Sequence, residues 1–239
     1  MGLSLWAGGF SVKHALLRDD MTHHGQCRHA PRDKKIRQWP MAKLHFRYAA
    51  MNAGKSTALL QAAHNYEERG MKVRLFTAAL DLRAGKGVIA SRLGMAREAE
   101  TFGPDTEFVR KHLGDDGIAC LFIDEAQFLT LEHVRQLHRL AHVDGIPVVC
   151  YGLRSDFRAE AFAGASALLT LADDIEEMKS VCACGRKATL NLRIDARGQR
   201  VREGEQVFIG GNDRYRAICP ACYYKDDELG PDAAPGLFG

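Results

Sequence analysis

Short apolar runs and longer amphipathic stretches alternate along the chain between about residues 44 and 172. The apolar runs are bounded by polar or glycine positions and predict β-strands at 44–50, 72–78, 119–124, 146–153 and 167–172. Two stretches between them predict helices at 54–70 and 130–145, and each ends on glycine, as helices often do. Apolar strands separated by helices are typical of a parallel sheet covered on both faces, so we predict an α/β fold.

The pattern changes on both sides of this region. Residues 1–40 have no steady hydrophobic period, and we expect a disordered leader or a true start at Met41. An α/β domain is then predicted for 41–178. Two close cysteine pairs and one strand-like run, 187–195, predict a small metal-held domain at 179–225. A flexible tail is expected at 226–239.

Composition and charge narrow the function. A chain of 239 residues is long enough for one domain with a small appendage. No apolar run approaches the roughly 20 residues that span a bilayer, so we expect no membrane partner. The net charge is +3, but residues 1–40 carry +4 and 41–239 carry −1, which does not indicate a nucleic-acid-binding face. Seven cysteines without a secretory signal favour metal ligation in the cytoplasm over disulfides.

The run YAAMNAGKSTALL at 48–60 resembles a phosphate-binding loop. The general motif is G-x-x-x-x-G-K-[ST] between a strand and a helix, and Gly54, Lys55 and Ser56 match it, whereas Ala49 replaces the first glycine. A helix N-terminus attracts anions, and a lysine and a serine there can contact phosphate and Mg²⁺. The alternative is an ordinary strand-to-helix turn.

Asp124 ends the buried strand predicted at 119–124, and a second acidic residue, Glu125, follows it. In a phosphate-loop enzyme, a carboxylate at this place helps to hold Mg²⁺. The alternative is a solvated strand end. The same run, FIDEAQF, also fits the Asp-Glu-Ala-x box of helicases, so a P-loop ATPase that acts on nucleic acid is a competing hypothesis. The short chain and its nearly neutral body argue against that motor.

Residues 41–225 resemble the thymidine kinases of bacteria and the animal cytosol. The resemblance rests on MAKLHFRYAAMNAGKSTALLQ, FIDEAQF, CYGLRSDFRAEAFAG, CACGRKATLNLR and EGEQVFIGGNDRYRAICPACY. It implies a P-loop NTPase-like α/β domain with a zinc-binding lasso domain. It also implies transfer of the γ-phosphate of ATP to the 5′-hydroxyl of thymidine, giving dTMP for nucleotide salvage, and a homotetramer inhibited by dTTP.

The resemblance also assigns roles to residues of the reaction centre. Glu125 would be the general base, and Ser56 and Asp124 would bind Mg²⁺. Asp81 and Arg83 match a D-x-R pair near the reaction centre, which spacing alone would suggest to be a loop salt bridge. The residues implied in binding ATP and its phosphates are Ala49, Ala50, Met51, Asn52, Ala53, Gly54, Lys55, Ser56 and Thr57.

The acceptor pocket would combine apolar walls with a lasso loop whose backbone grips the base. The residues implied are Met51, Leu153, Phe157, Phe162, Phe208, Ile209, Gly210, Gly211 and Tyr215. The alternative interpretation is that the apolar residues of this set belong to the hydrophobic core and bind no ligand. The metal would be a structural Zn²⁺ held by Cys182, Cys184, Cys219 and Cys222. We expect its loss to unfold the acceptor site without affecting the phosphate loop.

Overall fold

The computed structural model describes residues 42–114, 117–207 and 214–228. Its main element is a six-stranded sheet in the order β5-β2-β6-β7-β1-β8, in which every neighbouring pair is parallel. The strands are β1 (Leu44–Tyr48), β2 (Lys72–Ala78), β5 (Glu100–Phe102), β6 (Ile118–Ile123), β7 (Val148–Gly152) and β8 (Asp174–Glu177). The predicted α/β fold is confirmed.

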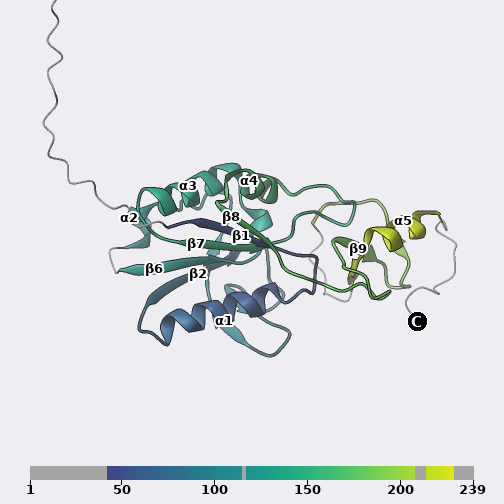
Figure 1. The fold of residues 1–239 in the computed structure, drawn as a ribbon, viewed down its shortest axis with the longest axis horizontal. Coiled ribbons are helices and arrows are strands. Elements are labelled where there is room, and N and C mark those ends of the chain that lie inside the picture. The colour runs from purple at the N-terminus through teal and green to yellow at the C-terminus, as the bar shows by residue number, and fades with distance from the viewer. Residues whose placement is uncertain (1–41, 115–116, 208–213, 229–239) are drawn as a thin grey trace, which may run out of the picture. The chain divides into compact units, whose positions relative to one another are not determined.

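Helices cover both faces of this sheet. Helix α1 (Lys55–Glu67) lies on one face, and α3 (Leu131–His142) and α4 (Ala163–Leu171) lie on the other (Figure 1). Side chains of a strand alternate between faces. Along β6, Cys120 and Phe122 pack in the cluster that contains α1 residues, whereas Leu121 and Ile123 pack with α3 and α4. Burial on both faces explains why β6 is a continuous apolar run.

One predicted strand is wrong. Residues 167–172 were expected to be extended, but 163–171 form α4, and the sheet continues instead with the polar strand β8. A short apolar run has no period that separates a strand from a buried helix. Gly164 lets α4 pack closely against the neighbouring backbone, because a Cβ there would lie 2.6 Å from the carbonyl oxygen of Leu129. The other six predicted strands and helices are present, with ends shifted by up to three residues.

A second, smaller sheet follows the main one. It is antiparallel, in the order β10-β9-β11, and consists of β9 (Leu190–Ile194), β10 (Arg200–Val201) and β11 (Tyr215–Ile218), followed by α5 (Pro220–Glu228). It has its own hydrophobic cluster, which includes Leu192, Ile194, Ile218 and three of the four paired cysteines. β9 lies within the strand-like run predicted at 187–195.

The remaining elements are short. They are the antiparallel hairpin of β3 (Val88–Ala90) and β4 (Ala96–Glu98), helix α2 (Arg110–Leu113) and the 3₁₀ helix η1 (Ala126–Phe128). The expected leader, 1–40, and residues 229–239 of the expected tail lie outside the described residues. The main sheet therefore positions the site: the loops that follow β1 and β6 emerge at the same edge, where parallel sheets bind ligands.

Candidate active site

The loop between β1 and α1 turns sharply just before the helix begins at Lys55. Gly54 has a φ of +79° and Asn52 a φ of +66°, and both lie in the left-handed region that glycine adopts readily. Gly54 caps α1 without a side-chain hydrogen bond. The first N–H groups of α1 carry partial positive charge, so this end of the helix is suited to bind a phosphate.

Lys55 is held at the base of this loop. Its side chain is buried, and its Nζ donates a hydrogen bond of 2.9 Å to the carbonyl oxygen of Ala50. Burial lowers the pKa of Lys55, and the nearby carboxylates of Glu125 and Asp124 oppose this effect. A phosphate bound at the loop would add negative charge and favour the ammonium form.

Asp124 directly follows β6 and lies beside the first turn of α1. It is only 4% exposed, and its Oδ2 accepts a hydrogen bond of 2.8 Å from the Ser56 hydroxyl. Burial, together with the negative charge of Glu125, raises the pKa of Asp124 to about 7. A hydroxyl and a carboxylate side by side are the oxygen ligands that Mg²⁺ prefers. The residue types therefore fit a Mg²⁺ ion that neutralises a buried carboxylate.

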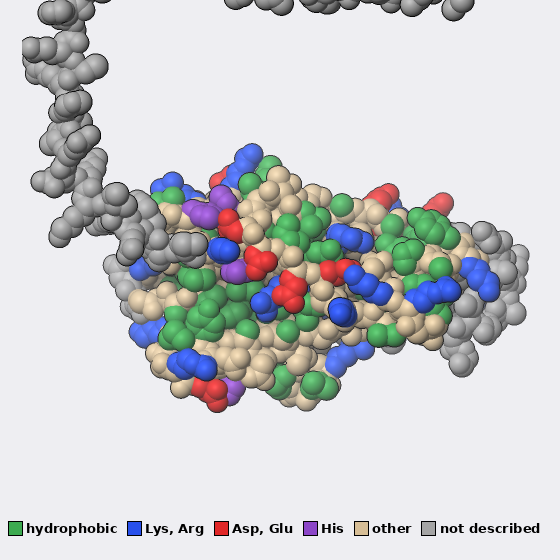
Figure 2. All heavy atoms as spheres, in the orientation of Figure 1, with side chains coloured by type: hydrophobic (Ala, Val, Ile, Leu, Met, Phe, Trp, Pro, Cys, Tyr) green, Lys and Arg blue, Asp and Glu red, His purple; other side chains and the backbone are tan. Residues whose placement is uncertain are grey.

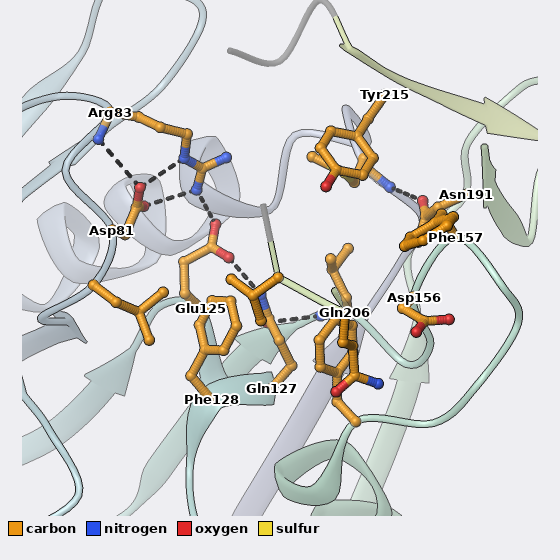
Figure 3. Close-up of a pocket in the computed structure, with 15 residues that line it drawn as sticks. Asp81, Arg83, Glu125, Gln127, Phe128, Asp156, Phe157, Asn191, Gln206 and Tyr215 are labelled. Carbon is orange, nitrogen blue, oxygen red and sulfur yellow. Dashed lines mark hydrogen bonds and ion pairs between the residues drawn. The ribbon is translucent and has the colours of Figure 1, made fainter. Parts of the chain in front are cut away.

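Glu125 has an unusual backbone conformation, with a φ of +53°, that is rare for residues other than glycine. Its N–H donates to Asp124 Oδ1 over 3.0 Å. Its carboxylate accepts one hydrogen bond from the guanidinium of Arg83 and another, of 2.5 Å, from Gln127 Nε2. Strained backbone is frequent at functional sites, and here it directs a doubly held carboxylate into a cavity (Figure 3).

Asp81 and Arg83 form a salt bridge beside Glu125. Arg83 Nε and one terminal nitrogen each donate a 2.7 Å hydrogen bond to the two oxygens of Asp81. This pairing, with the charge of Glu125, raises the pKa of Arg83 above its usual value. The pair is the loop salt bridge that spacing suggests, and it also positions Glu125 (Figure 3).

Two cavities meet at these charged groups. The first is lined by the loop from Met51 to Thr57, by Asp124 and by the hairpin residues 88–93. The second has largely apolar walls. The two share five lining residues: Met51, Asp81, Arg83, Glu125 and Leu153. A ligand in each cavity would therefore approach the other beside Glu125.

The apolar cavity contains most residues that the resemblance implies for the acceptor. Met51, Leu153, Phe157, Phe162 and Tyr215 all line it. Phe157 and Phe162 are also buried and Phe162 belongs to the main core, so the core interpretation and the pocket interpretation are compatible. Phe208, Ile209, Gly210 and Gly211 lie outside the described residues. Ala49 and Ala50 are buried where the loop leaves β1.

Sequence reasoning missed two buried amides that hold the site together. Gln127 is 2% exposed, and its Oε1 accepts from the N–H of Leu153 over 3.0 Å while its Nε2 contacts Glu125. Asn191, on β9, accepts from the N–H of Met51 over 2.7 Å and donates to the carbonyl of Ser155 over 2.9 Å. Gln127 lies in the segment FIDEAQF and Asn191 in CACGRKATLNLR. Only their polar side chains within these segments could have indicated a role in the site.

These contacts change one expectation. Asn191 joins the small sheet to Met51 in the phosphate loop, and Asn52 Nδ2 donates to the carbonyl oxygen of Tyr215 on β11 over 3.4 Å. We expected the phosphate loop to be unaffected by loss of the metal, but these two hydrogen bonds connect the loop to the small sheet. A disturbance of the small sheet would remove hydrogen bonds from the loop itself.

The four paired cysteines lie close together beside the small sheet. The Sγ atoms of Cys182, Cys184, Cys219 and Cys222 all lie within 4.8 Å of one another. The tight Cys182-Ala-Cys184 spacing is accommodated by a turn in which the N–H of Gly185 donates to the carbonyl of Cys182 over 2.8 Å. Four thiols in one cluster are a donor set that fits a tetrahedral metal such as Zn²⁺. The cluster suggests a structural metal because it supplies all four ligands.

Within the described ranges, no helix has both the length and the apolar character that crossing a membrane requires. The parallel sheet, the loop before α1 and the carboxylates after β6 define a P-loop kinase class, with an apolar cavity beside the cavity at the loop. Residues 42–223 match the family model described as thymidine kinase. The chain belongs to the thymidine kinase family.

Individual relatives agree with this assignment. The thymidine kinase of Albidiferax ferrireducens is 62% identical over 193 residues, which cover 81% of this chain and 98% of that protein. The thymidine kinase of Chromobacterium violaceum is 56% identical over 186 residues, covering 78% and 100%. A Bacteroides Pif1 structure bound to single-stranded DNA covers 57% of this chain and 38% of its own, at 17% identity and a TM-score of 0.33.

Proposed function

We propose that this protein is an ATP-dependent nucleoside kinase that transfers the γ-phosphate of ATP to the 5′-hydroxyl of thymidine and forms dTMP. Membership of the thymidine kinase family supports this reaction. The observation that carries the proposal is that the phosphate-loop cavity and the apolar cavity share Glu125, Arg83 and Asp81. A donor phosphate and an acceptor hydroxyl would therefore meet beside these side chains.

On the donor side, the loop at 49–57 and the ammonium of Lys55 bind the phosphates of ATP. Ser56 and Asp124 hold Mg²⁺, and the raised pKa of Asp124 supports a cation site because positive charge stabilises a buried carboxylate. When bound, Mg²⁺ neutralises charge on the phosphates during transfer.

On the acceptor side, Glu125 takes the proton from the 5′-hydroxyl as that oxygen forms a bond to the γ-phosphorus and the bond from this phosphorus to ADP breaks. Phosphoryl transfer has a loose transition state, so alignment and charge neutralisation supply most of the acceleration. The base contributes about 10²- to 10⁴-fold. Arg83 and Gln127 orient the carboxylate for this role.

The nucleoside occupies the apolar cavity, with its base between Met51, Leu153, Phe157 and Phe162. Tyr215 lies against the nucleoside, and the loop at 208–211 grips the edge of the base through its backbone. Apolar walls with a few polar groups are typical of small-molecule pockets, which supports this placement. Zn²⁺ on the cysteine cluster stabilises the unit that carries Tyr215.

The family resemblance also supports a homotetramer, feedback inhibition by dTTP, a cytoplasmic location and a place in thymidine salvage. The alternative, a P-loop ATPase that acts on nucleic acid, is not favoured by the family match. It is also disfavoured by the charge of −1 on residues 41–239, because binding to nucleic acid depends on positive charge.

ATP turnover by the purified protein with Mg²⁺ separates the two functions. The reactions contain no addition, each of the four deoxynucleosides in turn, or single-stranded DNA. We expect turnover only with thymidine and its close analogues, with one ADP formed for each dTMP. ATP hydrolysis that DNA stimulates, and that thymidine leaves unchanged, would instead establish the nucleic-acid-dependent ATPase.

A further inference from the structure

A second group of metal-ligating side chains lies away from the active site, at the end of α3. His138 and His142 are one helical turn apart, and Asp173 lies between α4 and β8. One ligand atom from each of the three lies within 4.8 Å of the other two. In Figure 2, histidine side chains lie beside acidic side chains on the face that carries this end of α3.

We propose that His138, His142 and Asp173 bind a divalent transition-metal ion, with Zn²⁺ as the expected occupant. Residues four apart on a helix project from the same face, so both imidazoles can reach one ion. Two imidazole nitrogens and a carboxylate suit zinc, cobalt or nickel, whereas calcium and magnesium prefer oxygen ligands alone. Three protein ligands leave a coordination position for water.

The geometry of the three side chains supports a shared ion. His142 Nε2 lies 3.0 Å from both carboxylate oxygens of Asp173, and the rings of His138 and His142 have their centroids 4.4 Å apart. An ordinary ion pair between His142 and Asp173 would account for the first contact. It would not account for the imidazole of His138, which can reach the same ion as His142 and Asp173.

The backbone around this group is already fixed. Asp173 Oδ2 accepts from the N–H of Leu44 over 2.8 Å, and the N–H of Asp173 donates to the carbonyl of Leu44 over 2.9 Å. On α3, Leu137, Leu140 and Ala141 are buried against the sheet. A hydrogen bond to the ligating carboxylate is the kind of support that orients metal ligands. Little conformational freedom would therefore be lost when the ion binds.

The location separates this group from catalysis. Leu44 begins β1 and Asp173 precedes β8, so the group lies at the amino-terminal edge of the parallel sheet, whereas the phosphate loop follows the other end of β1. The five residues of β1 place the two edges roughly 15 Å apart. The ion would fasten α3 to the outermost strand, β8, and would stabilise the fold without entering the reaction.

Cobalt titration of the full chain, with zinc already bound to the cysteine cluster, tests this site. We expect one further Co²⁺ per chain, with weak visible d–d absorption and without the intense near-ultraviolet band of cobalt thiolates. Both H138A and H142A should weaken this binding by more than about tenfold. The matched control is H64A on α1, where an exposed histidine pairs with Glu68 four residues later.

Cobalt binding, thermal stability and the absorption spectrum together decide whether this site exists. Selective loss of Co²⁺ binding in H138A and H142A, with a rise of thermal stability on metal addition only in the wild type and H64A, supports the site. Equal binding in all four proteins would overturn it, because the ion would then bind elsewhere. A thiolate band would also overturn it, since cobalt would have entered the cysteine cluster. Thymidine phosphorylation should be unchanged in both variants, so this proposal and the proposed function fail independently.

Discussion

Glu125→Gln gives the sharpest test of the reaction centre, because both side chains that contact the carboxylate are hydrogen-bond donors. Arg83 donates to one oxygen, and Gln127 Nε2 donates to the other. Gln127 cannot turn its amide around without losing the bond from the N–H of Leu153 to its Oε1. A glutamine at 125 must therefore place its own NH₂ group against a donor.

Two effects of different size follow from this geometry. An unpaired buried donor costs about 1–3 kcal/mol, so the free energy of unfolding should fall by about that amount. Loss of the base should lower kcat by about 10²- to 10⁴-fold. Thymidine affinity should change by less than about tenfold, because the apolar side chains that line the cavity are unchanged.

A double variant, Glu125→Gln with Gln127→Glu, separates these effects. The carboxylate at 127 can accept from the new amide at 125 and from the N–H of Leu153, which restores a partner for each donor. We expect the stability to return toward that of the wild type while kcat stays low. Glu132→Gln, on the exposed surface of α3, is the matched control.

The measurements are kcat at saturating ATP and thymidine, the Kd of thymidine by calorimetry, and denaturant unfolding. Unchanged turnover in the single variant would remove Glu125 from the role of base. Recovery of turnover in the double variant would show that a carboxylate at 127 can replace the one at 125, so that the position of the carboxylate is not decisive.

Three further predictions concern Asp124, the cysteine cluster and Asn191. Burial raises the pKa of Asp124 from 3.8 to about 7, so its contribution to the stability of the nucleotide-free protein is present below about pH 4 and is lost as the pH rises through about 7. Asp124→Asn should remove this pH dependence, raise the free energy of unfolding at pH 8 by up to about 4 kcal/mol and prevent turnover. Denaturant unfolding between pH 4 and 8 measures the stability of both proteins. A variant less stable than the wild type at pH 8 would contradict the prediction. Metal analysis should find about one zinc per chain, and an active protein without metal would disprove the structural role. Asn191→Leu should leave the N–H of Met51 and the buried carbonyl of Ser155 unpaired. We expect the free energy of unfolding to fall by about 2 kcal/mol and the KM for ATP to rise, in contrast to the exposed control Asn65→Leu.

Local sequence patterns predicted the layers of the fold and the turn at which α1 begins. Buried parallel strands such as β6 must be apolar on both faces, which makes them conspicuous. The spacing of Gly54, Lys55 and Ser56 indicated the phosphate loop because the chemistry there is local in sequence. α4 was missed because its apolar run is short, and polar β8 was missed because an edge strand need not be apolar.

The contacts that orient the site could not be predicted in this way. Asn191 and Met51 are 140 residues apart, and their hydrogen bond arises only when the small sheet meets the loop. Arg83 and Glu125 are 42 residues apart, so spacing suggested only the local partner of Arg83, which is Asp81. Such pairs follow from tertiary packing, and no periodic pattern in the sequence records them.

If the loop at 49–57 binds ATP and the cysteine cluster binds zinc, the hydrogen bond between Asn191 and Met51 would couple the two binding events. If zinc orders the small sheet, it favours the loop geometry that accepts ATP. Thermodynamic reciprocity then requires that ATP favours retention of zinc by the same factor. A cell that is short of zinc would first lose the chains that carry no nucleotide, and abundant ATP would protect the remainder.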